Sequence, residues 1–289
     1  MKLQTAYRKD TKLKVGISGA SGFGKTYSAL LLASGMTSNF NKICVIDTEN
    51  FSASLYSNLG EFKVINLQPP YSPERYIEAI KLCEKSNIEV IIIDSISHEW
   101  AGTGGCLEMH EKLGGRFQDW GKISPRHQAF IDTIIGSSCH IITTARRKTD
   151  YSLDKDNTGK TKVFKHGTKE ITRDGWEYEL TINFELVNDN HIVKASKDRT
   201  GLFMNKPEFI INKTTGQKLI EWYEPSEKLK AIYIEIQNCE SVEGLKHIYQ
   251  KHPSEQKRIY SRLVERKKQL NAIIDEKEIH DNLKKENNE

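Results

Sequence analysis

The run GASGFGKT, residues 19–26, restricts the fold of this 289-residue chain more than any other feature. It matches the pattern GxxxxGK[ST], and it lies between an apolar stretch, KVGIS, and a helix-forming stretch, YSALLLASGM. Glycines let a backbone turn tightly and point its N–H groups inward, and the helix that follows adds the positive end of its dipole. Such a loop surrounds phosphate groups. The pattern therefore predicts a strand, a phosphate-binding loop and a helix, in that order.

We expect this loop to bind ATP together with Mg²⁺. The lysine of the pattern reaches the outer phosphates, where its charge also makes it a candidate catalytic group, and the threonine gives its hydroxyl to the metal. The candidate ATP-binding residues here are Gly19, Ser21, Gly22, Phe23, Gly24, Lys25, Thr26 and Tyr27.

Further apolar runs of strand length follow, and stretches with helical spacing separate them. The runs are KVGIS (14–18), KICVID (42–47), EVIIID (89–94) and HIITTA (140–145). Continuous apolar runs are typical of parallel strands that are buried on both faces. The chain is therefore predicted to be an α/β protein with a mainly parallel sheet flanked by helices. Serine followed by proline predicts helix starts at Ser72 and Ser124.

The pattern changes in the second half of the chain. Apolar and polar residues alternate over 176–186, which predicts a half-buried strand, and HIVKAS should return antiparallel to it. A second hairpin is expected from EFIIN and KLIEWY, with its turn at Thr215–Gly216. From residue 226 the spacing is helical. We therefore predict an ATPase domain over 1–225, with antiparallel hairpins at its C-terminal edge, and a small helical region over 226–289.

Composition limits the class of protein. No apolar run approaches the ~18 residues that predict a membrane span, and the first residues lack the apolar core of a signal peptide. The five cysteines form no CxxC pair. These features indicate a cytoplasmic protein with free thiols and no membrane partner.

A phosphate-binding loop requires an acidic residue for the metal on a nearby strand. Asp94, at the end of EVIIID, is the candidate, and with Thr26 it completes the predicted metal set. Ser95 follows it where many such enzymes carry a catalytic glutamate. Glu49, at the end of the second strand, is the candidate that would orient the attacking water, and Glu99 is the alternative.

The order GxxxxGKT, VIDTEN, VIIIDSI and then a strand with a polar tip resembles the RecA-type ATPase core. The resemblance implies that Glu49 activates water, that Tyr56 stacks on adenine, and that Thr144 and its neighbours sense the nucleotide. KDRTG at 197–201 is similar to an element whose lysine and arginine, here Lys197 and Arg199, reach the nucleotide of the neighbouring subunit. An oligomer, either a ring or a filament, is implied. The usual glutamine of the sensor strand is missing.

Other blocks resemble RecA-like single-strand annealing proteins of phages and prophages. They are DSISHEW (94–100), WGKISPRH (120–127), TARRKTDY (144–151), RDGWEYE (173–179) and SKDRTGLF (196–203). This resemblance implies recombination, annealing or replication on single-stranded DNA, with a single-strand-binding protein as a possible partner. An alternative function is a nucleotide-gated interaction protein with weak ATPase activity that recruits such a partner or a helicase.

Basic residues are concentrated between 146 and 173, with nine Lys or Arg against four Asp or Glu. They predict a strip that contacts a DNA backbone, and two aromatic residues offer faces for bases. A solvated loop is the alternative. The strip comprises Arg146, Arg147, Lys148, Lys155, Lys160, Lys162 and Lys165, with Tyr151 and Phe164 as the aromatic residues.

Overall fold

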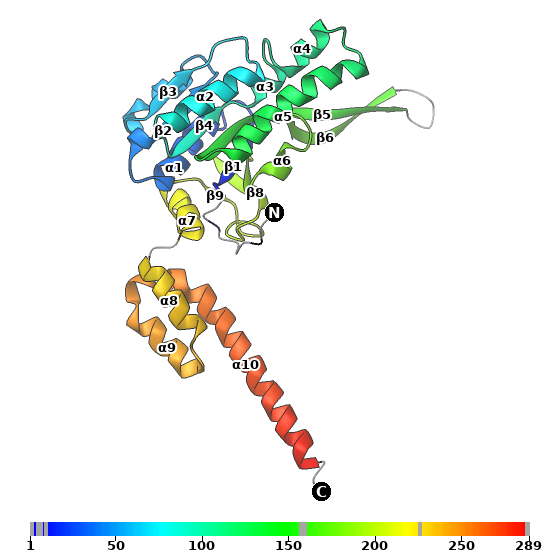
Figure 1. The fold of residues 1–289 in the computed structure, drawn as a ribbon. Coiled ribbons are helices and arrows are strands. Elements are labelled where there is room, and N and C mark those ends of the chain that lie inside the picture. The colour runs from blue at the N-terminus through cyan, green and yellow to red at the C-terminus, as the bar shows by residue number, and fades with distance from the viewer. Residues whose placement is uncertain (1–2, 4–7, 9–10, 156–160, 225–226, 287–289) are drawn as a thin grey trace. The chain divides into compact units, whose positions relative to one another are not determined.

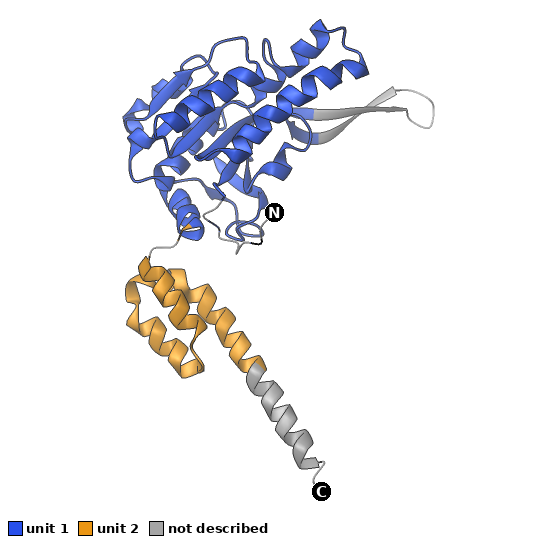
Figure 2. Cartoon of the chain, viewed as in Figure 1, with its two compact units in different colours: residues 1–223 blue, residues 224–289 orange. Residues whose placement is uncertain are grey.

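The computed structural model describes residues 3, 8, 11–155, 161–224 and 227–286, without the side chains of 150–166, 257 and 273–286 (Figure 1). The chain divides into two compact units, residues 1–223 and 224–289 (Figure 2). No helix in the described part is long and apolar enough to cross a membrane. Each unit is considered by itself below.

The first unit is an α/β domain with a mostly parallel sheet. Its strands are β1 (Lys14–Gly19), β2 (Ile43–Asp47), β3 (Lys63–Asn66), β4 (Val90–Asp94), β5 (His140–Lys155), β6 (Thr161–Glu170), β7 (Ile182–Leu186), β8 (Ile192–Asp198) and β9 (Phe209–Ile210). Its helices are α1 (Lys25–Met36), α2 (Pro73–Lys85), α3 (Ser97–Ala101), α4 (Cys106–Lys112), α5 (Trp120–Gly136), α6 (Trp176–Glu179) and α7 (Lys213–Tyr223).

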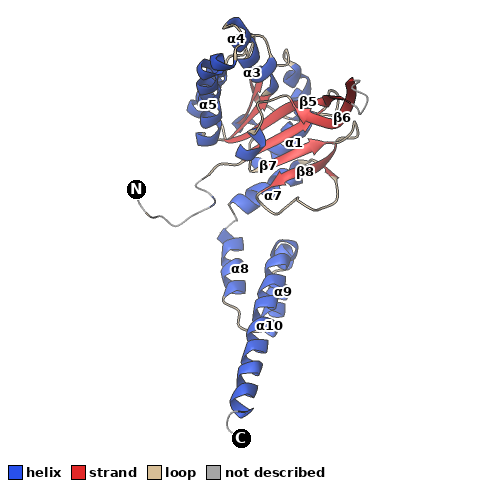
Figure 3. Ribbon diagram, turned by 90° about the vertical axis from the view of Figure 1, so that its right-hand side faces the viewer, coloured by secondary structure: helices blue, strands red, loops and turns tan. Residues whose placement is uncertain are grey.

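The described strands follow the order β3-β2-β4-β5-β1-β7-β8-β9, and β6 pairs with the second half of β5. Figure 3 shows β7 next to β8, and β6 beside β5. The first six strands of this order, β3-β2-β4-β5-β1-β7, are parallel to one another. Strand β8 is antiparallel to β7, and β9 is antiparallel to β8. Side chains of the central strands alternate between two apolar cores. Val45 and Ile92 lie in the core that contains α1 and α7, and Ile46 and Ile93 lie in the core that contains α2 and α5. The predicted fold class is confirmed.

The hairpin predicted for EFIIN and KLIEWY is wrong in its second half, because KLIEWY belongs to helix α7. Helix α7 packs directly on α1, and glycines make this close approach possible. A Cβ on Gly216 would lie 2.1 Å from the carbonyl oxygen of Leu32, and one on Gly35 would lie 1.9 Å from that of Lys213. Gly216 therefore serves a helix crossing and not a turn.

Two element boundaries also differ from prediction. Helix α5 begins at Trp120, so Pro125 lies inside the helix and not at its first position. The strand predicted over 176–186 begins only at Ile182, because residues 176–179 form α6. The glycine-rich segment 101–124 contains α4.

The second unit is helical and has its own apolar core. Helices α8 (Glu227–Gln237), α9 (Val242–Lys251) and α10 (Gln256–Glu286) form it. Leu229, Ile232, Leu245, Ile248 and Ile259 are among the buried residues of that core.

Candidate nucleotide site

The carboxyl ends of four neighbouring parallel strands bring the candidate residues to one edge of the sheet. Asp47 on β2 pairs in register with Asp94 on β4, and Thr144 on β5 pairs with Ile17 on β1, just before the phosphate loop. A cavity of about 730 Å³ opens there, lined by loop residues with Glu49, Tyr56, Asp94 and Arg146 among others. Ligands of α/β sheets bind at this edge.

Asp94 lies at the centre of the site. One carboxylate oxygen accepts a hydrogen bond of 2.6 Å from the Thr26 hydroxyl, and the other accepts one from the Thr144 hydroxyl. The side chain is buried, and burial raises the pKa of this carboxyl above its usual value although both hydroxyls favour the charged form. A buried carboxylate beside a hydroxyl supplies the hard oxygen ligands that Mg²⁺ prefers. Thr26 and Asp94 therefore fit the predicted metal site.

The RecA-type resemblance implied that Thr144 binds and senses the nucleotide. In the structure its side chain is fully buried and its hydroxyl donates a hydrogen bond to Asp94. It also does not line the cavity. Thr144 therefore orients the carboxylate that faces the metal site.

Lys25 begins α1 directly after the loop. Its ammonium donates a 2.9 Å hydrogen bond to the carbonyl oxygen of Ala20 and lines the cavity. Burial lowers the pKa of this ammonium, and the nearby carboxylates of Asp94 and Glu49 oppose that shift. A desolvated cation in this position is suited to an anionic ligand, because charge attraction grows as water is excluded.

Glu49 lies at the cavity, but its carboxylate is engaged. The Arg146 guanidinium forms a two-pronged ion pair with it, with an Nε–Oε1 distance of 2.9 Å. The Ser95 hydroxyl also donates to the carboxylate at 3.4 Å. Asp47 holds the backbone of this turn by accepting a 2.7 Å hydrogen bond from the Glu49 amide. In this arrangement Arg146 occupies the oxygens that a water molecule would need.

The alternative base, Glu99, is positioned for another task. It is completely buried and is not among the residues that line the cavity. Its carboxylate pairs with His127 Nδ1 at 3.0 Å and accepts a hydrogen bond of 3.1 Å from the Cys106 thiol. Glu99 therefore joins α3, α4 and α5 and does not face the nucleotide loop.

Aromatic rings form the outer rim of the cavity. Tyr56 and Tyr27 both line it, with ring centroids 5.8 Å apart, and His191 is 6.3 Å from Tyr27. The Nδ1 of His191 donates a 2.7 Å hydrogen bond to the Phe23 carbonyl. A Cβ on Gly24 would lie 2.4 Å from that imidazole. Sequence reasoning missed His191, whose only signal was its place in the turn after β7.

Lys197 and Arg199 lie away from this cavity. Both donate to the backbone carbonyl of Tyr178 at the end of α6, Lys197 at 2.6 Å and Arg199 at 2.7 Å. Neither lines the cavity of its own chain.

The predicted basic strip is only partly a surface. Arg146 pairs with Glu49, and Arg147, with 15% of its side chain exposed, pairs with Glu170 and Glu185 at 3.6 and 3.3 Å. Both arginines therefore have carboxylate partners within the protein, and 43% of the Arg146 side chain is exposed. Lys148 is exposed. Lys155, Lys160, Lys162, Lys165, Tyr151 and Phe164 lie outside the described side chains.

Comparison with known proteins identifies the domain. Residues 11–214 match the model of the family described as AAA domain. The chain belongs to this family. It thus carries an ATPase-family P-loop domain. No curated protein matches the chain.

One similar solved structure is that of an ATPase from the type III secretion system of pathogenic bacteria. It is 13% identical, with a TM-score of 0.34, over 62% of this chain and 53% of that chain. The matched region thus spans about half the length of that structure.

Proposed function

We propose that the chain is a Mg²⁺-dependent ATP hydrolase that assembles with copies of itself and acts on single-stranded DNA in recombination, annealing or replication. The observation that carries the nucleotide part is the contact of Thr26 with Asp94 beside the Lys25 ammonium. It unites the hydroxyl, the carboxylate and the cation that an ATP-binding P-loop requires.

Each group has a defined task in this proposal. Loop amides and Lys25 hold the phosphates, Thr26 and Asp94 hold Mg²⁺, and Tyr27 and Tyr56 face the base. When bound, Mg²⁺ neutralises charge on the phosphates. Glu49 orients the attacking water once its carboxylate is released from Arg146. Lys197 and Arg199 lie off their own cavity, which supports the role of a finger that serves a neighbouring subunit.

The Glu49–Arg146 pair favours a second candidate function as well. Arg146 holds the carboxylate of the candidate base, and a chain with its base held in this way would bind ATP but hydrolyse it slowly. Such a chain would act as a nucleotide-gated interaction protein that recruits a single-strand-binding protein or a helicase. The two functions differ in whether assembly or DNA raises turnover.

Steady-state ATPase rates, measured over protein concentration with and without single-stranded DNA, separate the two candidates. We expect specific activity to rise with concentration and with DNA. A rate that stays low and constant under both changes would refute the hydrolase proposal in favour of the second candidate.

A further inference from the structure

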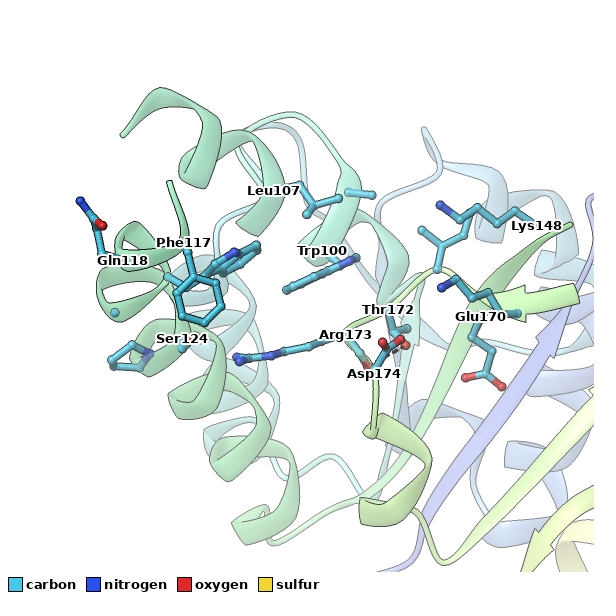
Figure 4. A pocket seen from close by; sticks show the side chains of 16 residues that line it. Trp100, Leu107, Phe117, Gln118, Ser124, Lys148, Glu170, Thr172, Arg173 and Asp174 are labelled. Atoms are coloured by element: carbon cyan, nitrogen blue, oxygen red, sulfur yellow. Dashed lines mark hydrogen bonds between the residues drawn. The ribbon is translucent and has the colours of Figure 1, made fainter. Parts of the chain in front are cut away.

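A cavity of about 930 Å³ lies beside the middle of β5 and the C-terminal end of β6, and no residue of the nucleotide loop lines it. We call it the aromatic cleft. One wall carries Trp100, Phe117 and Trp120, and the other carries Lys148, Lys169 and Arg173. Figure 4 shows Trp100 and Arg173 extending into the same opening, with Phe117 on the helical side and Lys148 on the strand side.

The aromatic wall is a stacked array. The rings of Trp100 and Trp120 lie 5.5 Å apart and within 14° of parallel, and His110 stacks on Trp120 at 4.1 Å. Phe117 is 91% exposed. A phenyl ring left in water forgoes the free energy that its burial would supply. Its exposure at a cleft indicates a ligand with an apolar face.

A buried cluster fixes this wall. His127 contacts the edge of the Trp100 ring at 5.5 Å, and it pairs with Glu99, the residue next to Trp100. Cys106 donates to the same carboxylate from the start of α4. Three helices are thus joined behind the rings, so the platform exists before any ligand arrives. Preorganisation lowers the entropy cost of binding.

The opposite wall is mainly cationic. Lys148 and Lys169 are exposed and Arg173 is half-buried. Glu170 also lines the cleft, but its carboxylate already accepts from Asn183 at 2.9 Å and pairs with Arg147. Asp174 is the exposed carboxylate there. The net field along this wall therefore favours an anion.

Planar faces opposite cations match one ligand class, an unpaired nucleotide. We propose that the aromatic cleft binds bases of single-stranded DNA, with a base against Phe117 and Trp100 and the backbone phosphate at Lys148 and Arg173. The inference rests on the proposed function and assigns its DNA site. Duplex bases are already stacked, so the cleft selects single strands, and stacking tolerates any base sequence.

The cleft is also connected to the nucleotide site. Ile171 lines both cavities. Glu170, on the wall of the cleft, pairs with Arg147, which lines the nucleotide cavity. Occupation of the cleft is therefore expected to change the ATPase rate.

Phe117 offers the sharpest test because its exposure makes substitutions harmless to folding. Binding of labelled oligo-dT to the full chain is measured by fluorescence anisotropy with Mg²⁺ and a non-hydrolysable ATP analogue. The variants are Phe117→Ala, Phe117→Leu and Phe117→Trp, with Leu82→Ala on α2 as the matched surface control. Sedimentation confirms equal oligomeric states. A 5-iododeoxyuridine oligonucleotide locates the contact by photocrosslinking.

We expect Phe117→Ala and Phe117→Leu to weaken binding by at least ~5-fold, the low end for loss of one stacked base, while Phe117→Trp and Leu82→Ala bind as wild type. Crosslinks should map to Phe117 or Trp100. Equal binding by all variants, when wild type binds DNA, overturns the cleft and leaves the proposed function standing. Wild type that binds no DNA refutes both. Full binding of oligo-dT by Phe117→Leu, with loss of binding by Phe117→Ala, identifies a merely apolar contact and overturns the stacking site.

Discussion

His140, at the start of β5, gives the first unit a stability that depends on pH in a calculable way. The imidazole is buried, and its Nδ1 accepts a 3.0 Å hydrogen bond from the Leu13 amide, which requires the neutral ring. Burial lowers the pKa of His140 from 6.5 to about 3, and the charges of Lys12 and Lys14 add to this. The unfolded chain therefore binds a proton between these two values and the folded chain does not. The contribution of His140 to stability therefore falls as the pH falls below 6.5.

The size of the effect follows from the two pKa values. Between pH 7 and pH 5, protonation of the unfolded chain at a site with a pKa of 6.5 lowers the free energy of unfolding by about 2 kcal/mol. Solvent screens the charge of this imidazole little, because the residue is only 6% exposed. Carboxylates with ordinary pKa values change little over this interval, since they remain ionised.

The assay is urea unfolding followed by tryptophan fluorescence. All four tryptophans, at 100, 120, 176 and 222, lie in the first unit, so the signal reports that unit alone. His140→Asn retains an acceptor for the Leu13 amide but does not titrate. It loses the ring contact with Tyr223, so it should be less stable at both pH values. Its loss between pH 7 and pH 5 should be smaller than that of wild type by about 2 kcal/mol. Equal losses in the two proteins would refute the reasoning.

Three further predictions concern catalysis, packing and assembly. Glu49→Gln should cut turnover at least ~100-fold with ATP affinity retained, as measured by single-turnover kinetics and equilibrium binding, and an unchanged rate would contradict the assignment. Gly216→Ala should lower the free energy of unfolding by ~2 kcal/mol or more because its Cβ meets backbone, whereas Gly121→Ala, with open space around its Cβ, serves as the control in the same urea assay. Arg199→Ala and Lys25→Ala should each be inactive in an ATPase assay, yet a mixture of the two should regain part of the activity. Arg199→Ala supplies an intact nucleotide site, and Lys25→Ala supplies an intact arginine finger. Exchange of subunits without recovery of activity would exclude a shared site.

The central sheet could be predicted because its strands carry the signal themselves. A strand that is buried on both faces needs consecutive apolar residues, as in Val90–Asp94. Few other short elements need such a run, so the run itself predicts a strand. The phosphate loop was predictable for a similar reason, since its glycines and lysine are needed at fixed spacing. Neither inference required knowledge of which strands are neighbours.

Helix α7 was mispredicted because its short apolar pattern suits a strand as well as a helix. A helix signal was present nonetheless. Asn212 Oδ1 accepts from the Thr215 amide, and Thr215 Oγ1 accepts from the Asn212 amide, both at 3.2 Å, in the reciprocal manner of a capping box. The glycine at 216 suggested a turn because its use in a helix crossing depends on α1, far away in sequence.

The segment 176–186 shows how two periods can coincide. Trp176 and Leu180 are both buried and four residues apart, which satisfies a helical turn as well as an alternating strand. Tyr178, between them, is 70% exposed and breaks the alternation. Only the strand that starts at Ile182 follows the predicted pattern, since it pairs with β1 inside the sheet.

The arginines after β5 show why adjacent basic residues on a strand do not form one surface. Successive side chains of a strand point to opposite faces. Arg146 accordingly pairs with Glu49, whereas Arg147 pairs with Glu170 and Glu185, although both arginines line the nucleotide cavity. The sequence could have predicted different partners for these two arginines on this ground alone, but it could not have named them. Glu49 and Arg146 are 97 residues apart, and their contact depends on β4 lying between β2 and β5, an order that local pattern does not encode.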